Sequence, residues 1–201
     1  KGSGEKAAFL RLDMSDYAGA YDHQQLSGYP KAAGGGSRGI LTAFVEANPG
    51  GVVLVDEVEK AHGATHNVFL QVLDAGRLLD TPTQKEVDFS SATLIFTTNL
   101  GQSLWDSPEK AGFLAESRDL SETLIEALRE TDERPGLPQE ILSRLAKGSL
   151  VLFDRLGAVA LERLAARGVE GASEEIRARY GVGISADDAF GRPPLGPGDQ
   201  L

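Results

Sequence analysis

The sequence predicts an α/β fold in which a parallel β-sheet is flanked by helices. Two short apolar runs, Val52–Val55 and Ala92–Thr97, are typical of buried strands, and helical patterns lie on both sides of each run. Strands that alternate with helices indicate a parallel sheet. Because apolar and mostly β-branched residues fill the first run without alternation, we expect that strand to be buried on both faces of the sheet.

Length and composition fit one domain with a small appendage. The 201 residues are 41% hydrophobic and 25% charged, which is ordinary for a globular protein with a sizeable core. The net charge of −10, with scattered Lys and Arg, argues against nucleic acid or an anionic membrane as the main partner. With no cysteine, no signal-peptide pattern and no apolar run near 18 residues, a cytoplasmic protein is expected.

Apolar spacing and turn signals predict the elements of the first hundred residues. In order, these are a strand at 7–12, a loop at 24–39, helices at 40–47 and 59–74, a small hairpin or loop excursion at 78–89 and a strand at 92–97. Asn48-Pro49-Gly50 and Ala75-Gly76 are stop signals that end the two helices. Thr81-Pro82-Thr83 marks the turn of the hairpin.

The second half of the chain is richer in helix. Its expected elements are an irregular stretch at 102–118, helices at 120–129 and 137–145, a third apolar strand at 150–153, and amphipathic helices at 158–167 and 173–180. Pro138 suits the first turn of its helix. The tail from Gly191 is rich in proline and glycine and is expected to be unstructured.

Polar residues follow two of the predicted strands. Asp56 and Glu57 come directly after the central strand, and Asn99 follows the next one. The carboxyl ends of strands in open α/β sheets form the edge that binds ligands. There, an Asp can hold the water shell of a phosphate-bound magnesium ion, a Glu can activate an attacking water, and an Asn can hold that water near a γ-phosphate. The residues alone equally allow a solvated acidic turn at Asp56 and Glu57. For a lone Asn such as Asn99, a turn-forming residue before Gly101 is the commoner interpretation.

Six longer strings appear in order along the first half of the chain, from Arg11 to Gly101. They are Arg11-Leu-Asp-Met-Ser-Asp-Tyr17, Gly39-Ile-Leu-Thr42, Val53-Leu-Val-Asp-Glu-Val-Glu-Lys-Ala-His62, Val68-Phe-Leu-Gln-Val-Leu-Asp-Ala-Gly-Arg77, Val87-Asp-Phe89 and Thr97-Thr-Asn-Leu-Gly101. Together they resemble the second ATPase module of the Hsp100/Clp family of AAA+ protein unfoldases, the ClpA, ClpB and ClpV type. The resemblance implies a P-loop NTPase-like large subdomain at 1–155, without its first strand and Walker A loop, and a partial helical lid with a flexible tail at 156–201.

The resemblance also implies roles for four residues. Asp56 matches the residue that holds magnesium through water, Glu57 the residue that activates the hydrolytic water, and Asn99 the first sensor. These three are therefore expected to bind ATP and Mg²⁺. Arg144 matches the arginine finger, which reaches the γ-phosphate of a neighbouring subunit and stabilises charge in the transition state. Without the resemblance, Arg144 would be interpreted as a surface residue of its helix.

By the same resemblance, the intact protein is expected to be an ATPase that forms a homo-oligomeric ring, a hexamer, and remodels protein substrates as an unfoldase or disaggregase. The alternative is a degenerate AAA-like assembly or interaction module that no longer hydrolyses ATP. A DNA-remodelling protein is disfavoured by the negative net charge and by the Clp-type strings.

Three stretches depart from the family pattern. No G-x-x-x-x-G-K-S/T string is present, so these 201 residues alone are not expected to hydrolyse ATP. Where the family has a Gly-Tyr-Val-Gly pore loop, this chain has Pro30-Lys-Ala-Ala-Gly-Gly35, which places alanine at Ala32 and Ala33 and leaves Tyr29 as a loop anchor. Near Arg192 the lid string G-A-R-P-L has only a faint counterpart, so that residue is given no role.

His62 and His66 are four residues apart, a spacing at which two histidines on one helix can bind a metal ion. No carboxylate is evident as a third ligand. Exposed or packed histidines are therefore the favoured interpretation.

Overall fold

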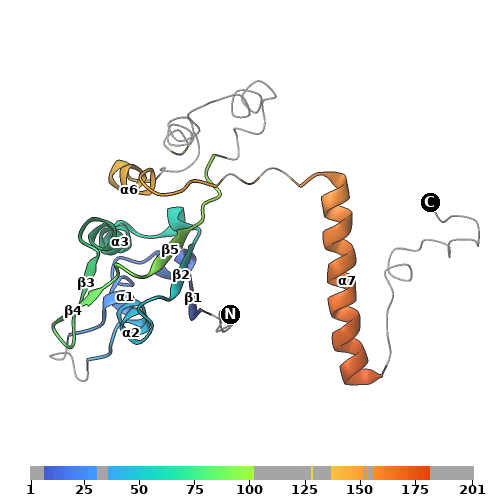
Figure 1. The fold of residues 1–201 in the computed structure, drawn as a ribbon, viewed down its shortest axis with the longest axis horizontal. Helices are drawn as coiled ribbons and strands as arrows, with labels where there is room; N and C mark the ends of the chain where they lie inside the picture. The colour runs from blue at the N-terminus through green and yellow to red at the C-terminus, as the bar shows by residue number, and fades with distance from the viewer. Residues whose placement is uncertain are drawn as a thin grey trace, which may run out of the picture. The chain divides into compact units, whose positions relative to one another are not determined.

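The computed structural model describes residues 7–30, 36–101, 128, 137–151, 153 and 156–181 (Figure 1). The predicted irregular stretch at 102–118, nearly all of the predicted helix at 120–129, and the tail from Gly191 lie outside the described residues. So do Ala32, Ala33 and Arg192.

Three parallel strands form the main sheet, which confirms the predicted fold class. They are β1 (Phe9–Asp13), β2 (Val52–Asp56) and β5 (Thr93–Phe96), in the order β1-β2-β5. In the register of the sheet, Asp13 lies opposite Asp56 and Val55 opposite Phe96. The carboxyl ends of all three strands therefore meet at one edge.

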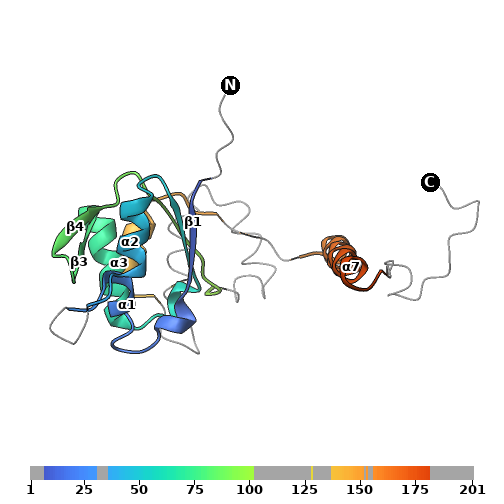
Figure 2. The ribbon, with the colours of Figure 1, turned by 90° about the horizontal axis from the view of Figure 1, so that it is seen from below.

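Helices α2 (Ile40–Ala47) and α3 (Gly63–Ala75) cover one face of this sheet, and the antiparallel hairpin of β3 (Arg77–Asp80) and β4 (Lys85–Asp88) lies on their far side (Figure 2). The core forms between the sheet and the helices. Its fully buried side chains include Met14, Leu26, Leu41, Val45, Val53, Val55, Phe69, Ile141 and Leu142. Phe69 of α3 meets Phe96 of β5 edge to face, with ring centroids 5.5 Å apart, an arrangement that stabilises aromatic pairs.

The opposite face of the sheet is only partly covered, so the expectation that the central strand is buried on both faces was wrong. Val53 and Val55 are fully buried, but Val52 and Leu54 are half-buried. On the neighbouring strands Phe9 is 59% exposed and Ile95 45% exposed. Because alternate side chains of a strand point to opposite faces, the apolar run in β2 faces the helical core with every second residue only.

Several predicted bounds differ from the structure. α3 begins at Gly63 rather than Glu59, because a 3₁₀ turn, η3 (Val58–Lys60), follows the strand first. The predicted loop at 24–39 contains one helical turn, α1 (Gln24–Ser27), which buries Leu26. The helix at 40–47 and the hairpin at 78–89 are confirmed.

In the second half, α6 (Gln139–Leu145) confirms the predicted helix, whereas the strand expected at 150–153 was wrong. Val151 is 73% exposed and Phe153 is 84% exposed, and no pairing is recorded for that stretch among the described residues. An apolar run does not become a strand without a neighbour to accept its backbone hydrogen bonds.

Contacts divide the chain into a unit of residues 1–151 and a unit of residues 152–201. The assignment of a large subdomain at 1–155 and a partial lid at 156–201 stays a prediction. The second unit contains α7 (Ala158–Tyr180), one continuous helix where two were expected. Gly168 and Gly171 lie in its interior, and each costs about 1 kcal/mol relative to Ala without breaking a helix. In the described part of the chain, no helix has the length and apolar character needed to cross a membrane.

Candidate functional site

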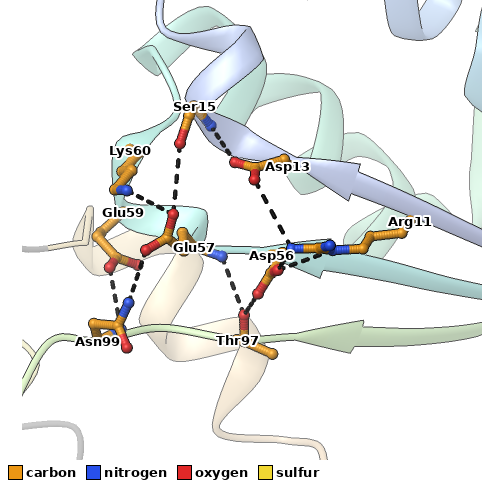
Figure 3. Close-up of polar contacts among 9 residues, drawn as sticks. All are labelled: Arg11, Asp13, Ser15, Asp56, Glu57, Glu59, Lys60, Thr97 and Asn99. Carbon is orange, nitrogen blue, oxygen red and sulfur yellow. Dashed lines mark hydrogen bonds and ion pairs between the residues drawn. The ribbon is translucent and has the colours of Figure 1, made fainter. Parts of the chain in front are cut away.

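The carboxyl edge of the sheet gathers a cluster of polar side chains (Figure 3). Asp13, Asp56 and Thr97 follow or end the three strands, and Glu57 and Asn99 lie just beyond. The Nδ2 group of Asn99 donates a hydrogen bond to Oε1 of Glu57 at 2.8 Å. The structure therefore brings together the residues that the sequence placed at the ends of two strands.

Asp56 is held by two donors that sequence reasoning missed. The Thr97 hydroxyl donates to its Oδ1 atom. The Arg11 guanidinium donates to Oδ2, with Nε at 3.0 Å and Nη2 at 2.5 Å. The Thr97 hydroxyl first, and the Arg11 guanidinium second, hold the pKa of Asp56 below its usual value. Asp56 is therefore a stable anion at neutral pH.

Glu57 adopts a backbone conformation that is rare outside glycine. Its φ is 56° and its ψ 52°, in the left-handed region, which costs energy for a residue with a Cβ. The amide of Glu57 donates to Thr97 Oγ1 at 3.1 Å, and its Oε2 atom accepts from Lys60 Nζ at 2.6 Å. This turn carries the chain out of the sheet and leaves the carboxylate between Asn99 and Lys60 (Figure 3).

Asn99 is also held through its backbone. Its amide donates to Oε1 of Glu59 at 3.1 Å, while Oε2 of Glu59 is buried and has no hydrogen-bond partner among the residues that the structure describes. Glu57 and Glu59 together therefore fix the side chain and the main chain of Asn99. Within the string Val53–His62, sequence reasoning gave a role to Asp56 and Glu57 only.

Arg144 lies away from this cluster. Its Nε and Nη2 atoms donate to the two carboxylate oxygens of Asp74, at 2.7 and 3.2 Å, and its Nη1 atom donates to Ser143 at 2.8 Å. The Asp74 carboxylate raises the pKa of Arg144 further above its usual value. Asp74 lies in the last turn of α3, whereas Glu57 precedes the first turn, and the 13 residues of the helix span about 20 Å. Within one chain, the structure does not bring Arg144 to Glu57.

The two histidines have structural contacts. His62 caps α3, with Nδ1 accepting from the Ala64 amide at 3.1 Å. His66 is buried, with Nε2 2.9 Å from the carbonyl oxygen of Val58. Within the described ranges, no group of three or more His, Cys, Asp or Glu side chains is arranged to hold a metal ion.

The carboxylate oxygens at the sheet edge suit a cation that prefers oxygen ligands and is bound through water. Asp56 supplies carboxylate oxygens, the ligand type that magnesium prefers. Each of these oxygens already accepts from Thr97 or Arg11, and an ionised carboxylate oxygen can accept a second hydrogen bond. The side chain of Asp56 is 22% exposed, so a hydration water can reach it.

A parallel sheet with carboxylates and an amide at its carboxyl edge is consistent with the α/β fold of AAA+ proteins. The chain belongs to the family of AAA domains of the Cdc48 subfamily, whose family model matches residues 2–147. The resemblance to Hsp100/Clp proteins is likewise confirmed by curated relatives and by a solved structure.

Among the relatives, a heat shock protein 100 of Trypanosoma brucei brucei is 36% identical over 180 residues, which is 89% of this chain and 20% of that protein. The chloroplastic chaperone protein ClpC4 of rice, Oryza sativa subsp. japonica, is 34% identical over 92% of this chain and 19% of its own length. The chaperone protein ClpB of Propionibacterium freudenreichii is 36% identical over 80% of this chain and 17% of its length.

A cryo-EM structure of Hsp104 in a closed state, with ATPγS and FITC casein, has a TM-score of 0.59 to this chain. The two are 28% identical, and the match covers 86% of this chain and 27% of the Hsp104 chain. The chain thus spans about a fifth of the length of the curated relatives that it matches.

Proposed function

We propose that the intact protein hydrolyses ATP and uses that reaction to remodel protein substrates, as a disaggregase-type chaperone. One observation carries this proposal: the Glu57 carboxylate is fixed by Asn99 and Lys60 next to Asp56, at the sheet edge that binds ligands in α/β folds. The names of the relatives, heat shock protein 100 and ClpB chaperones, support it. So does the Hsp104 neighbour, which was solved with ATPγS and casein.

Each residue of the cluster has a chemical task in this proposal. Magnesium, when bound, neutralises charge on the phosphates, and Asp56 would hold one of its hydration waters. Glu57 accepts the proton of the attacking water, and Asn99 keeps the carboxylate oriented through its hydrogen bond of 2.8 Å. The strained backbone of Glu57 is consistent with such a role, because strained residues cluster at functional sites.

In this proposal, Arg144 reaches the γ-phosphate of the ATP that a neighbouring subunit binds. The intact protein would therefore form a ring of identical chains, which we propose is a hexamer. Its distance from Glu57 of the same chain supports an action in trans. A guanidinium has five N–H donors, and Asp74 and Ser143 use three of them. The Asp74 carboxylate orients the guanidinium, and two donors stay available for a phosphate oxygen of the next subunit.

The loop between Gly28 and Gly39 is the proposed point of contact with a protein substrate. It holds the stretch Pro30–Gly35 that matches the pore loop of the family. Tyr29, at its start, is 38% exposed, and its amide donates to the Ser37 carbonyl oxygen at 2.9 Å. The location of the intact protein in the cytoplasm stays a prediction.

The experiment measures ATP hydrolysis by the intact protein with and without an unfolded protein such as casein. Motor function predicts a basal turnover that rises several-fold with the unfolded protein and not with the same protein in its folded form. A ring that binds ATP but does not hydrolyse it, with or without substrate, would contradict the proposal. That result would instead support the degenerate assembly module.

A further inference from the structure

A carboxylate in the hairpin is buried and hydrogen-bonded to the neighbouring loop. Asp80, at the end of β3, is 0% exposed. It accepts hydrogen bonds from Thr42 Oγ1 at 2.6 Å, Thr83 Oγ1 at 2.5 Å, Arg38 Nε at 3.3 Å and the Gly39 amide at 3.4 Å. Burying a charge is unfavourable unless it is paired and bonded. Four donors from three segments of the chain satisfy Asp80.

Two of those donors form one end of the loop between Gly28 and Gly39. Arg38 also forms an ion pair with Glu46 of α2 at 2.5 Å and an antiparallel bridge with Gly28. One residue further into the loop, the Tyr29 amide donates to the Ser37 carbonyl at 2.9 Å. The two ends of the loop are therefore bonded to each other, and Asp80 holds the end that contains Arg38.

The turn of the hairpin holds the other end. The Thr81 amide donates to the Ser27 carbonyl oxygen at 2.8 Å. Gly28 has a φ of +96°, and a Cβ at this position would lie 2.5 Å from Cδ of Pro82. Such a distance is far below van der Waals contact, so only glycine fits between the loop and the turn.

The hairpin is joined directly to the helix that follows the candidate site. Gly76 ends α3 and its carbonyl oxygen accepts from the Phe89 amide at 2.8 Å, which ties the base of the hairpin to the end of the helix. α3 itself begins six residues after Glu57. The chain therefore leads from the carboxylate cluster through η3, α3 and β3 to Asp80, which bonds the base of the loop.

We propose that Asp80 and Arg38 are positioning residues that clamp the base of the loop between Gly28 and Gly39 onto the β3–β4 hairpin, and so set how well that loop engages a protein substrate. The inference rests on the proposed function, because it takes this loop as the point of substrate contact. An exposed guanidinium beside a buried carboxylate suits this task, since the pair fixes geometry more than it adds stability.

The functional test compares Arg38→Met and Asp80→Asn with the parent in the intact protein. Arg38→Met keeps the apolar stem and removes the donors of a side chain that is 40% exposed, so it is expected to fold. For both variants, basal ATP turnover is expected to stay within about two-fold of the parent. The casein concentration that gives half-maximal stimulation is expected to rise at least about five-fold.

The matched control is Arg77→Met. Arg77 lies on the same hairpin, is 62% exposed and pairs with Glu86 at 3.4 Å, away from the loop. It is expected to leave both basal turnover and the casein dependence unchanged. If Arg38→Met and Asp80→Asn both assemble and keep the casein dependence of the parent, the positioning role is refuted.

Amide hydrogen exchange tests the clamp without any activity. In the parent, the hydrogen-bonded amide of Tyr29 is expected to be protected from exchange. In Arg38→Met, the same amide is expected to exchange at least about ten-fold faster. Arg77→Met is expected to leave that exchange unchanged. If casein does not stimulate the parent, the proposed function fails while the exchange still decides the clamp. Unchanged Tyr29 exchange in both Arg38→Met and Asp80→Asn would overturn the clamp.

Discussion

Replacing Thr97 with valine should loosen the candidate site with almost no change of shape. The Thr97 hydroxyl donates to Asp56 Oδ1 and accepts from the Glu57 amide at 3.1 Å. Valine retains the branched side chain but can make neither bond. The Glu57 amide then loses its partner in a backbone conformation that is already unfavourable, with a φ of 56°.

The expected loss follows from these two bonds. A hydrogen bond contributes about 0.5–1.5 kcal/mol net, and a buried group left without a partner costs about 1–3 kcal/mol. Both bonds lie in a partly buried setting, so solvent can replace some of what is lost. We expect the free energy of unfolding of this domain to fall by about 2 kcal/mol. For a domain of 150–250 residues, that corresponds to a fall in Tm of about 4–8 °C.

Thr97→Ser is the matched control, because it keeps the hydroxyl and removes only a methyl group. Calorimetry of the intact protein would follow the transition of this domain in the parent and both variants, together with ATP turnover. We expect Thr97→Val to lose more stability than Thr97→Ser and to turn over ATP more slowly. If the valine variant matches the parent in Tm and turnover, the hydroxyl does not organise the two carboxylates.

Four further predictions concern single positions. Asn99→Ala should lower turnover more than ATP affinity, as initial rates and equilibrium binding would reveal, because Glu57 loses its orienting bond of 2.8 Å. Arg144→Ala should do the same, and mixed rings with Glu57→Gln subunits should regain activity; mixed rings without rescue would count against an action in trans. Ala33→Tyr should raise stimulation by unfolded casein if the loop grips substrate, and unchanged stimulation in intact rings would argue otherwise. Burial raises the pKa of Asp80, but its hydrogen bonds, first that from Thr42, lower the pKa below the usual value. The free energy of unfolding should therefore fall as the pH drops below about 4, and it should fall less in Asp80→Asn, as acid titrations of both proteins would show.

The parts of the fold that follow from local pattern were predictable. The helix at 40–47 has an amphipathic run and the stop signal Asn48-Pro49-Gly50, and the structure ends it at Ala47. The hairpin has a proline turn between two short runs, and it forms. In both cases the residues that fix the element lie within a few positions of each other.

Burial and strand formation were harder, because they depend on partners elsewhere in the chain. The apolar run at 150–153 looks like the central strand in sequence, yet no pairing is recorded for it in the described part of the chain. Val52 and Leu54 have the composition of core residues, but the helices α2 and α3 cover the other face of the sheet. No local signal in the sequence reports on either circumstance.

In the candidate site, Asp56, Glu57 and Asn99 could be proposed because strand ends of a parallel sheet converge. The roles of Arg11, Thr97 and Glu59 could not, because each depends on register across strands or on a backbone amide. Alternation along β1 offered one signal: Arg11 and Asp13 share a face of their strand. The left-handed conformation of Glu57 has no signal, since glycine is the residue expected there.

The most direct test of the central claim is the comparison of ATP binding and ATP turnover in the intact protein with Glu57→Gln. Glutamine keeps an oxygen for the Asn99 amide but cannot accept a proton from water. We predict ATP affinity within about three-fold of the parent and turnover lower by about 10²–10⁴-fold, the range over which a general base accelerates a reaction. Turnover at the parental rate, with ATP bound equally well, would show that Glu57 does not activate the hydrolytic water.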